Sequence, residues 1–231
     1  TIENAAEAYA AQAIALKDGG VDVIWIETIS SIEEATAAVM GAKETNLPIV
    51  LTMSIDSNGR TMMGVTPSEI RILQSQLPEK PTAFGANCGI GAAEVIAAII
   101  NMQIDIDLNS TSPILVAKGN CGIPEWVDGH ICYSGTPELM ANYAAMAIDA
   151  GARLIGGCCG TTPAHVAAMR EAIDTHNKKS RPTMEEIESK LGKLCTGTRA
   201  QLQGDVTRLG GAASERSPRK RNRSRNRKSK A

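Results

Sequence analysis

The sequence predicts an α/β protein built around a parallel sheet. Strand-like apolar runs alternate with helix-like segments at least five times, with about thirty residues per unit. This is the pattern of βαβ units with right-handed crossovers. An open doubly wound sheet and a (β/α)8 barrel both fit this alternation. The barrel is favoured because its strand ends surround one mouth, and polar or sulfur-bearing residues follow the apolar runs here: Glu27, Cys88, Asn120, Cys158 and Cys159.

The first half of the chain supplies three strands with helices between them. An Ala-rich helix is expected over residues 2–17, ended by Gly19-Gly20, and near-continuous apolar runs predict buried strands at 21–26, 49–55 and 82–87. Ser31 with Glu34 forms a capping box that starts the second helix. Thr66, Pro67 and Glu69 give the next helix a cap, a first-turn proline and a box glutamate.

The second half continues the pattern. A helix is expected from about 92 to 102, a strand at 114–118, and then a longer loop through Trp126 and His130. Thr136-Pro137 opens a helix, residues 153–157 form the fifth strand, and Thr162-Pro163 opens a helix that runs to about His176. Because a typical barrel needs about 250 residues, five strands between residues 21 and 159 suggest that three are absent.

Composition limits the kind of protein. The chain has 231 residues, of which 43% are apolar, enough for one sizeable core. No apolar run reaches eighteen residues and no signal-peptide pattern occurs, so neither a membrane span nor secretion is expected. The chain starts without Met, which suggests a fragment or a processed protein. In such a chain six cysteines favour metal binding or catalysis over disulfides, in a reducing cytoplasm.

The charge is distributed unevenly. Residues 214–231 hold nine of the 24 Lys and Arg residues and one acid, which leaves the rest of the chain strongly acidic. Such a tail could bind nucleic acid or an anionic surface, but no aromatic residues interleave for base stacking. We therefore expect a disordered, solubilising tail. The predicted organisation is residues 1–178 as part of a barrel, 179–195 as a short C-terminal helix, and 196–231 as a disordered basic tail.

The run Gly156-Gly157-Cys158-Cys159-Gly160-Thr161 predicts a metal site. Neighbouring cysteines on a strand point to opposite faces, but glycines on both sides let the backbone bend until both sulfurs converge. Two thiolates suit a soft or borderline metal and need a third ligand. Cys88, which ends another apolar run, is the best candidate, although a lone cysteine there is by default a small buried hydrophobe.

These residues also carry a family resemblance. Asn87-Cys88 together with the Gly-Gly-Cys-Cys-Gly-Thr run resembles the homocysteine S-methyltransferase domain, supported by Ile26-Glu27-Thr28 and Gly119-Asn120-Cys121-Gly122. The similarity covers roughly residues 1–175 and is greatest to bacterial betaine-type enzymes. It implies a (β/α)8 barrel of which this chain carries strands four to eight.

The resemblance also implies the chemistry. Cys88, Cys158 and Cys159 would bind Zn²⁺, Glu27 would bind the amino group of homocysteine, and Asn87 would be a substrate-site residue that orients the site. Three cysteines leave one tetrahedral position for the homocysteine thiol, which coordination would ionise for attack on a methyl group of betaine or a related donor.

Several alternatives stay open. Glu27 could be an ordinary salt-bridged carboxylate, Asn120 could simply satisfy loop backbone groups, and Cys121 could lie near the mouth without being a ligand. The chain could instead be the homocysteine domain of a cobalamin-dependent methionine synthase, or an inactive fragment with a structural zinc site. The methyl donor and the oligomeric state are left open.

Overall fold

The computed structural model of the chain describes residues 1–56, 58–103 and 114–205. Its main sheet has five parallel strands in the order β1-β2-β3-β4-β7, which follows their order in the chain. The predicted α/β class with a parallel five-stranded sheet is confirmed. The strands are β1 Ile24–Ile29, β2 Ile49–Ser54, β3 Ala83–Cys88, β4 Ile114–Gly119 and β7 Leu154–Gly157.

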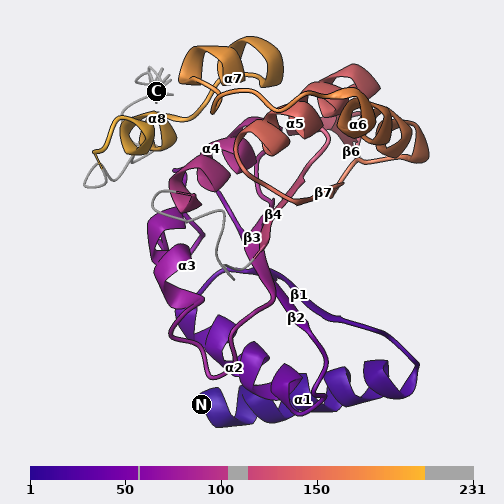
Figure 1. Cartoon of the computed structure of the whole chain (residues 1–231), viewed down its shortest axis with the longest axis vertical. Helices are drawn as coiled ribbons and strands as arrows, with labels where there is room; N and C mark the ends of the chain where they lie inside the picture. Colours follow the sequence, from indigo (N-terminus) through magenta and orange to yellow (C-terminus); the bar gives the residue numbers. More distant parts are fainter. Residues whose placement is uncertain (57, 104–113, 206–231) are drawn as a thin grey trace, which may run out of the picture.

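Helices cover one face of this sheet and form an outer arc around it (Figure 1). A doubly wound sheet would instead reverse its strand order at a switch point and carry helices on both faces, so the observed arrangement is like part of a barrel wall. The helices are α1 Ile2–Asp18, α2 Ile32–Lys43, α3 Pro67–Leu73, α4 Ala92–Met102, α5 Pro137–Asp149, α6 Pro163–Thr175, α7 Met184–Leu191 and α8 Thr196–Leu202.

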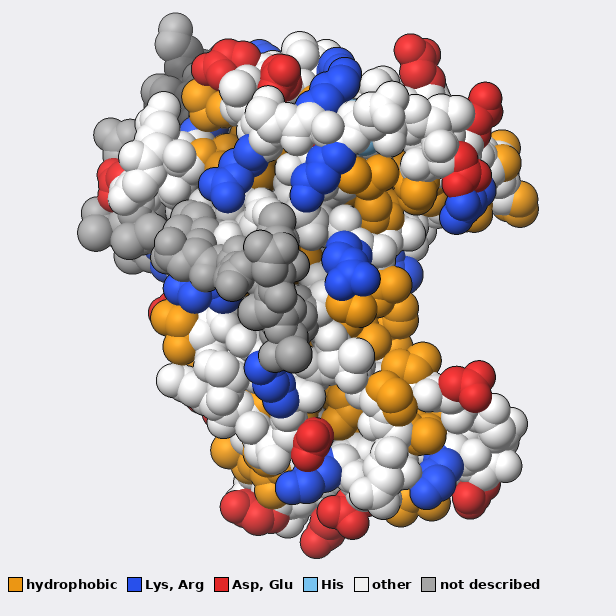
Figure 2. Space-filling model, viewed as in Figure 1, with side chains coloured by type: hydrophobic (Ala, Val, Ile, Leu, Met, Phe, Trp, Pro, Cys, Tyr) orange, Lys and Arg blue, Asp and Glu red, His pale blue; other side chains and the backbone are white. Residues whose placement is uncertain are grey.

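The two faces of the sheet are packed very differently. The face toward the helices carries the large core cluster, which includes Leu51 and Phe84. On the opposite face the described residues form a small buried cluster of Val50, Ala83 and Val116. The molecule is hollowed on one side, and hydrophobic side chains line the hollow (Figure 2). The chain therefore presents a concave sheet face on which inward side chains remain accessible.

Side-chain caps explain where the helices begin. Thr66 and Glu69 form the predicted reciprocal capping box at α3, and Thr183 and Glu186 do the same at α7. At α2 the Ser31 hydroxyl accepts the Glu34 N–H, while the Glu34 carboxylate accepts from Ser30 instead of closing the box. Local chemistry thus fixes the helix starts that orient the βα loops.

The predicted loop through Trp126 and His130 is wrong. Residues 124–133 form an antiparallel hairpin of β5 Pro124–Val127 and β6 His130–Tyr133. Its two-residue turn is Asp128-Gly129, and both residues have positive φ, 48° and 84°. Asp-Gly in a turn of this kind matches the twist of the flanking strands, so the sequence carried a hairpin signal there.

The predicted disordered tail begins too early. Residues 196–202 form α8, which packs against α4. The buried Glu94 carboxylate on α4 accepts the Cys195 N–H at 2.7 Å and a hydrogen bond from the Thr198 hydroxyl. These contacts order a segment whose composition alone suggests a flexible tail. The basic run 214–231 lies outside the described residues.

No helix in the described ranges combines the length and the apolar character needed to cross a membrane.

Candidate metal and substrate site

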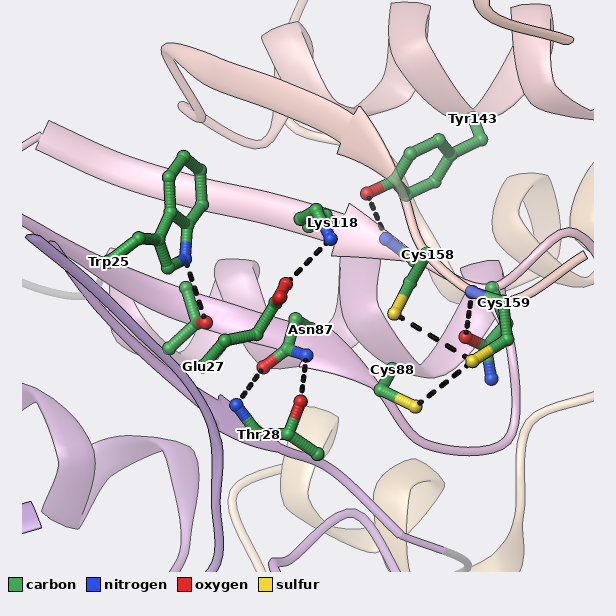
Figure 3. Close-up of polar contacts among 12 residues, drawn as sticks. Trp25, Glu27, Thr28, Asn87, Cys88, Lys118, Tyr143, Cys158 and Cys159 are labelled. Atoms are coloured by element: carbon green, nitrogen blue, oxygen red, sulfur yellow. Dashed lines mark hydrogen bonds and ion pairs between the residues drawn. The ribbon is translucent and has the colours of Figure 1, made fainter. Parts of the chain in front are cut away.

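The site is built at the C-terminal ends of the strands, where parallel strands bring their following loops together (Figure 3). Asn87 and Cys88 end β3, Lys118 lies near the end of β4, and Cys158 and Cys159 directly follow β7. The β4 residues Lys118 and Gly119 pair with Asn87 and Cys88 on β3 and with Gly156 and Gly157 on β7. Residues distant in the sequence therefore meet on one edge of the sheet.

Three sulfur atoms converge there. The sulfurs of Cys88, Cys158 and Cys159 all lie within 4.8 Å of one another. Cys88 Sγ is 3.9 Å from Cys159 Sγ, and Cys158 Sγ is 4.0 Å from Cys159 Sγ. Two thiolates bound tetrahedrally to one zinc ion at about 2.3 Å lie about 3.8 Å apart. The spacing of the three sulfurs therefore fits one shared metal ion.

An unusual backbone conformation places Cys88. Its φ is +56°, a left-handed value that is uncommon for residues other than glycine, and Gly89 follows with φ of +71°. A Cβ at Gly89 would lie 1.7 Å from the carbonyl oxygen of Ile55. The chain can therefore turn sharply here only with glycine after the cysteine. Such strained turns are found at functional sites, where the surrounding structure holds them.

Asn120 connects the two cysteine-bearing loops. Its side-chain amide donates to the carbonyl oxygen of Gly89 at 2.6 Å and accepts the Cys159 N–H at 3.1 Å. The carbonyl of Cys159 in turn accepts the N–H of Cys121 at 2.9 Å. Because Asn120 is buried and uses both ends of its amide, it fixes the separation between the loop after β3 and the loop after β7.

The cluster favours a bound cation. Burial, followed by the negative charge of Cys88, raises the pKa of Cys158 to about 11, and the positive charge of Lys118 opposes this rise. Three thiolates this close together repel one another unless a positive charge lies among them. The donor set of three cysteine sulfurs also matches the ligands that zinc prefers. Both its geometry and its chemistry therefore fit a zinc ion.

An ion pair spans the concave face beside the sulfurs. Lys118 Nζ on β4 donates to Glu27 Oε1 on β1 at 2.6 Å, across the strands between them (Figure 3). The side chains are 27% and 36% exposed. Burial on its own lowers the pKa of Lys118, but the hydrogen bond to Glu27 and the charges of Cys158, Glu27 and Cys159 outweigh it, and the pKa is raised. Lys118 is therefore a persistent cation.

Comparison with known proteins decides the family. A family profile described as homocysteine S-methyltransferase matches residues 1–173. The chain belongs to the homocysteine S-methyltransferase family.

Individual relatives agree. The chain is 29% identical over 180 residues to a methionine synthase of Mycobacterium tuberculosis (strain ATCC 25618 / H37Rv), a match covering 72% of this chain and 14% of the relative. The apo and oxidised structures of the Escherichia coli homocysteine methyltransferase MmuM each match with a TM-score of 0.55, at 26% and 28% identity. These matches cover 72% of this chain and 57% and 52% of the MmuM chains. The homocysteine S-methyltransferase chain thus spans little more than half of those structures.

The predicted site residues of this family member have distinct surroundings. The structure brings the three predicted cysteines together, and their role as zinc ligands stays a proposal. Glu27 lies on the same edge but is paired with Lys118. Asn87 is buried, and its amide is occupied by Thr28: it accepts the Thr28 N–H at 3.0 Å and donates to the Thr28 hydroxyl at 2.7 Å. This geometry suits orientation of the site, and direct contact with substrate stays a prediction.

Sequence reasoning overlooked Lys118 and Tyr133. Lys118 interrupts the apolar run of β4 two residues after Val116 and so shares the concave face with it. Tyr133 ends the hairpin, with its ring against Gly160, where a Cβ would lie 2.4 Å from Tyr133 Cγ. Burial, then a hydrogen bond to Cys159 and the thiolate charges, raises the pKa of Tyr133. The alternation of side-chain faces along β4 was the available signal for Lys118, and the Asp-Gly turn of the hairpin was the available signal for Tyr133.

The remaining candidates have structural surroundings. Cys121 is buried and lies outside the sulfur cluster of the described residues. Asn120 satisfies loop backbone groups, as one interpretation of the sequence expected. His165 Nδ1 accepts the Thr162 N–H at the start of α6, and His176 Nε2 lies 2.8 Å from Asp149 Oδ1. In the described part of the chain neither histidine belongs to a metal-ligand cluster.

Proposed function

We propose that this homocysteine S-methyltransferase moves a methyl group from betaine or a related small onium donor to the thiol of homocysteine, forming methionine. The observation that carries the proposal is the convergence of three cysteine sulfurs within 4.8 Å at the strand ends of a member of this family. We further propose that residues 1–178 are part of a (β/α)8 barrel, as the outer arc of helices and the sequential strand order suggest.

Cys88, Cys158 and Cys159 would hold Zn²⁺, and no fourth protein ligand is among the clustered residues of the described chain. When bound, the ion would supply a Lewis acid that keeps the homocysteine thiol ionised at neutral pH. With the thiol already ionised, methyl transfer needs no general base from the protein. Because thiols must be free to ligate, the proposed setting is a reducing one such as the cytoplasm, and all six cysteines are unpaired.

The other residues of the site would orient the substrate. Glu27 would attract the ammonium group of homocysteine, and Asn87 would fix Thr28, the neighbour of Glu27 in the chain. Asn120 would hold the two cysteine loops at a constant separation. Holding nucleophile and donor in line contributes to rate by removing the entropy of encounter. The protein's contribution is therefore mostly positional.

The methionine synthase relative supports a second candidate, in which the chain is the homocysteine domain of a cobalamin-dependent methionine synthase. The two candidates share the metal site and differ in the methyl donor. A third possibility is an inactive fragment that holds zinc structurally. Measurements of zinc content and of methionine formation, with betaine and with methylcobalamin offered in turn, separate the three.

The decisive test combines cysteine variants with these assays. We expect about one zinc ion per chain, lost in Cys88→Ser, Cys158→Ser and Cys159→Ser and kept in Cys132→Ser, whose exposed thiol lies outside the cluster. Methionine formed with betaine supports the main proposal, and methionine formed only with methylcobalamin supports the second. Zinc without turnover supports the inactive fragment, and zinc retained in all three site variants overturns the metal site.

A further inference from the structure

The Glu27–Lys118 pair occupies an unusual place for a structural ion pair. Its two residues lie on β1 and β4, at the end of the concave face nearest the sulfur cluster, and neither side chain is fully buried. Ion pairs this accessible to solvent contribute little to folding stability. A long lysine side chain also loses rotamer freedom when it is held in one geometry. Stability therefore gives little reason for this arrangement.

The pair is a good match for a zwitterion. An α-amino acid carries an ammonium and a carboxylate separated by one carbon atom. A carboxylate and an ammonium of the protein that lie side by side, 2.6 Å apart, can each exchange its partner for the opposite charge of such a ligand. Both protein charges then remain paired, so the exchange leaves no uncompensated charge in a half-buried site.

The neighbourhood of Lys118 places this exchange beside the metal site. Lys118 pairs in register with Gly156 on β7, two residues before Cys158, and Gly156 has no side chain to block the concave face. The N–H of Cys158 donates to the carbonyl oxygen of Gly119, the residue after Lys118, at 2.8 Å, so the end of β4 directly contacts the cysteine-bearing loop. A thiol on a short chain could thus reach the cluster while its charged head group stays at the pair.

We propose that Lys118 binds the α-carboxylate of homocysteine while Glu27 binds its α-ammonium, so that the ion pair of the free site opens to receive the amino acid. This inference rests on the proposed function. It makes Lys118 a substrate-binding residue that selects amino-acid thiols over simple thiols. The lysine acts through a hydrogen bond between charged groups, which is stronger than one between neutral groups.

Three ligands separate the contributions of the two residues. Homocysteine carries both charges, 3-aminopropane-1-thiol lacks the carboxylate, and 4-sulfanylbutanoate lacks the ammonium. Binding of each to the zinc-loaded full chain is measured by calorimetry for the wild type, Lys118→Met, Lys118→Arg and Glu27→Gln. Zinc content and circular dichroism of each variant establish that the fold and the metal site persist.

We expect Lys118→Met to weaken homocysteine binding about tenfold to a hundredfold, as loss of a charged hydrogen bond does. The same variant binds 3-aminopropane-1-thiol as tightly as the wild type or more tightly, because Glu27 no longer has a competing partner. Lys118→Arg keeps most of the preference for homocysteine. Glu27→Gln shows the opposite pattern, weakening the two amines and sparing 4-sulfanylbutanoate.

Other outcomes overturn the inference. Equal weakening of homocysteine and 3-aminopropane-1-thiol in Lys118→Met would mean that the lysine only positions Glu27. Unchanged homocysteine binding with weaker betaine binding would place the carboxylate of the donor at Lys118. A zinc-loaded wild type that binds none of the thiols would overturn the proposed function itself, and this inference with it.

Discussion

Asn87 links the β3 strand end to Thr28, whose own φ is +66°. The Asn87 amide makes two hydrogen bonds to this single residue. Their loss would leave the Thr28 N–H without a partner in a partly buried place, and a strained conformation persists only when its surroundings hold it. Asn87 thus maintains the backbone geometry of the strand end that presents Glu27.

We predict that Asn87→Ala lowers the free energy of unfolding by about 1–3 kcal/mol, because the partly buried Thr28 N–H loses its acceptor. Homocysteine binding should weaken as well, since Thr28 and with it Glu27 lose their fixed position. Chemical denaturation and calorimetric binding check the two effects. The matched control is Asn177→Ala at an exposed position, and a variant at residue 87 as stable as this control contradicts the prediction.

The cysteine cluster makes metal affinity depend on pH. Each thiol must lose its proton to bind zinc, so affinity rises with pH below the thiol pKa values. Burial and neighbouring charge raise the pKa of Cys158 to about 11, which extends proton competition well above neutral pH. If three thiols each release one proton, the apparent affinity changes by up to about a thousandfold per pH unit.

We therefore predict a steep loss of zinc between pH 8 and pH 6, measured against a competing chelator. Cys132→Ser, whose thiol lies outside the cluster, should keep the wild-type slope. A wild-type slope of about tenfold or less per pH unit would mean that at most one thiol releases a proton on binding zinc, and would contradict the three-cysteine site.

Among single residues, the sequence identified those whose neighbours along the chain are distinctive. Cys158 and Cys159 were recognisable because glycines flank them at a strand end, and Cys88 because it ends an equivalent run. The local pattern places Lys118 on the same face as Val116 but does not identify its partner, because the pairing with Glu27 depends on the strand order that brings β4 into register with β3 and β7. A cross-sheet ion pair cannot be deduced until the register is known.

The element that sequence reasoning misjudged most is α8. Its segment is short and near a Gly- and Arg-rich region, but tertiary contacts override local composition. The Glu94 carboxylate on α4 accepts hydrogen bonds from residues at the start of α8. Gln201 Nε2 donates to the carbonyl oxygen of Asn58 at 3.2 Å. A Cβ at Gly59 would lie within 3.1 Å of Gln201 Nε2, so α8 packs closely on the loop after β2. The β5–β6 hairpin differs from α8, because its Asp128-Gly129 turn is a signal that the local sequence itself contains.

Glu94 gives this docking a pH dependence. Burial raises its pKa above the ordinary value of 4.5, despite the hydrogen bonds from Cys195 and Thr198. The folded chain therefore holds this proton more tightly than the unfolded chain. The resulting contribution to stability is fully present below pH 4.5 and is lost as the pH rises through the folded-state pKa.

We predict that Glu94→Gln becomes more stable relative to the wild type as the pH rises from 4 to 7, because it removes the buried charge and keeps an acceptor. Glu94→Ala loses both hydrogen bonds and should cost about 1–3 kcal/mol, with faster hydrogen exchange over residues 196–202. Glu79→Ala, in an exposed loop, is the control. Unchanged exchange in Glu94→Ala would show that α8 docks independently of Glu94.

For the whole molecule, the apolar runs gave the number and direction of the strands of the main sheet correctly, because buried parallel strands are apolar throughout. Among the described residues, no strand pairing joins β1 to β7, so the sheet is open there. β1 and β7 are both edges of the five-stranded sheet. A groove of about 240 Å³ lies between α1, α2 and β1, and Trp25 is among its lining residues.

The β1 edge exposes apolar side chains, with Val21, Val23 and Trp25 each 37–40% accessible. Uncovered strand edges and apolar patches favour association between chains.

We predict that the 231-residue chain in isolation binds hydrophobic dye strongly and self-associates at micromolar concentration. Val23→Lys, which places a charge beside this edge, should reduce association in sedimentation velocity. Ile72→Lys, at an exposed position on α3 away from both edges, should reduce it less. A monomeric chain with low dye binding and one sharp cooperative melt would show instead that these five strands and their helices are a self-sufficient fold.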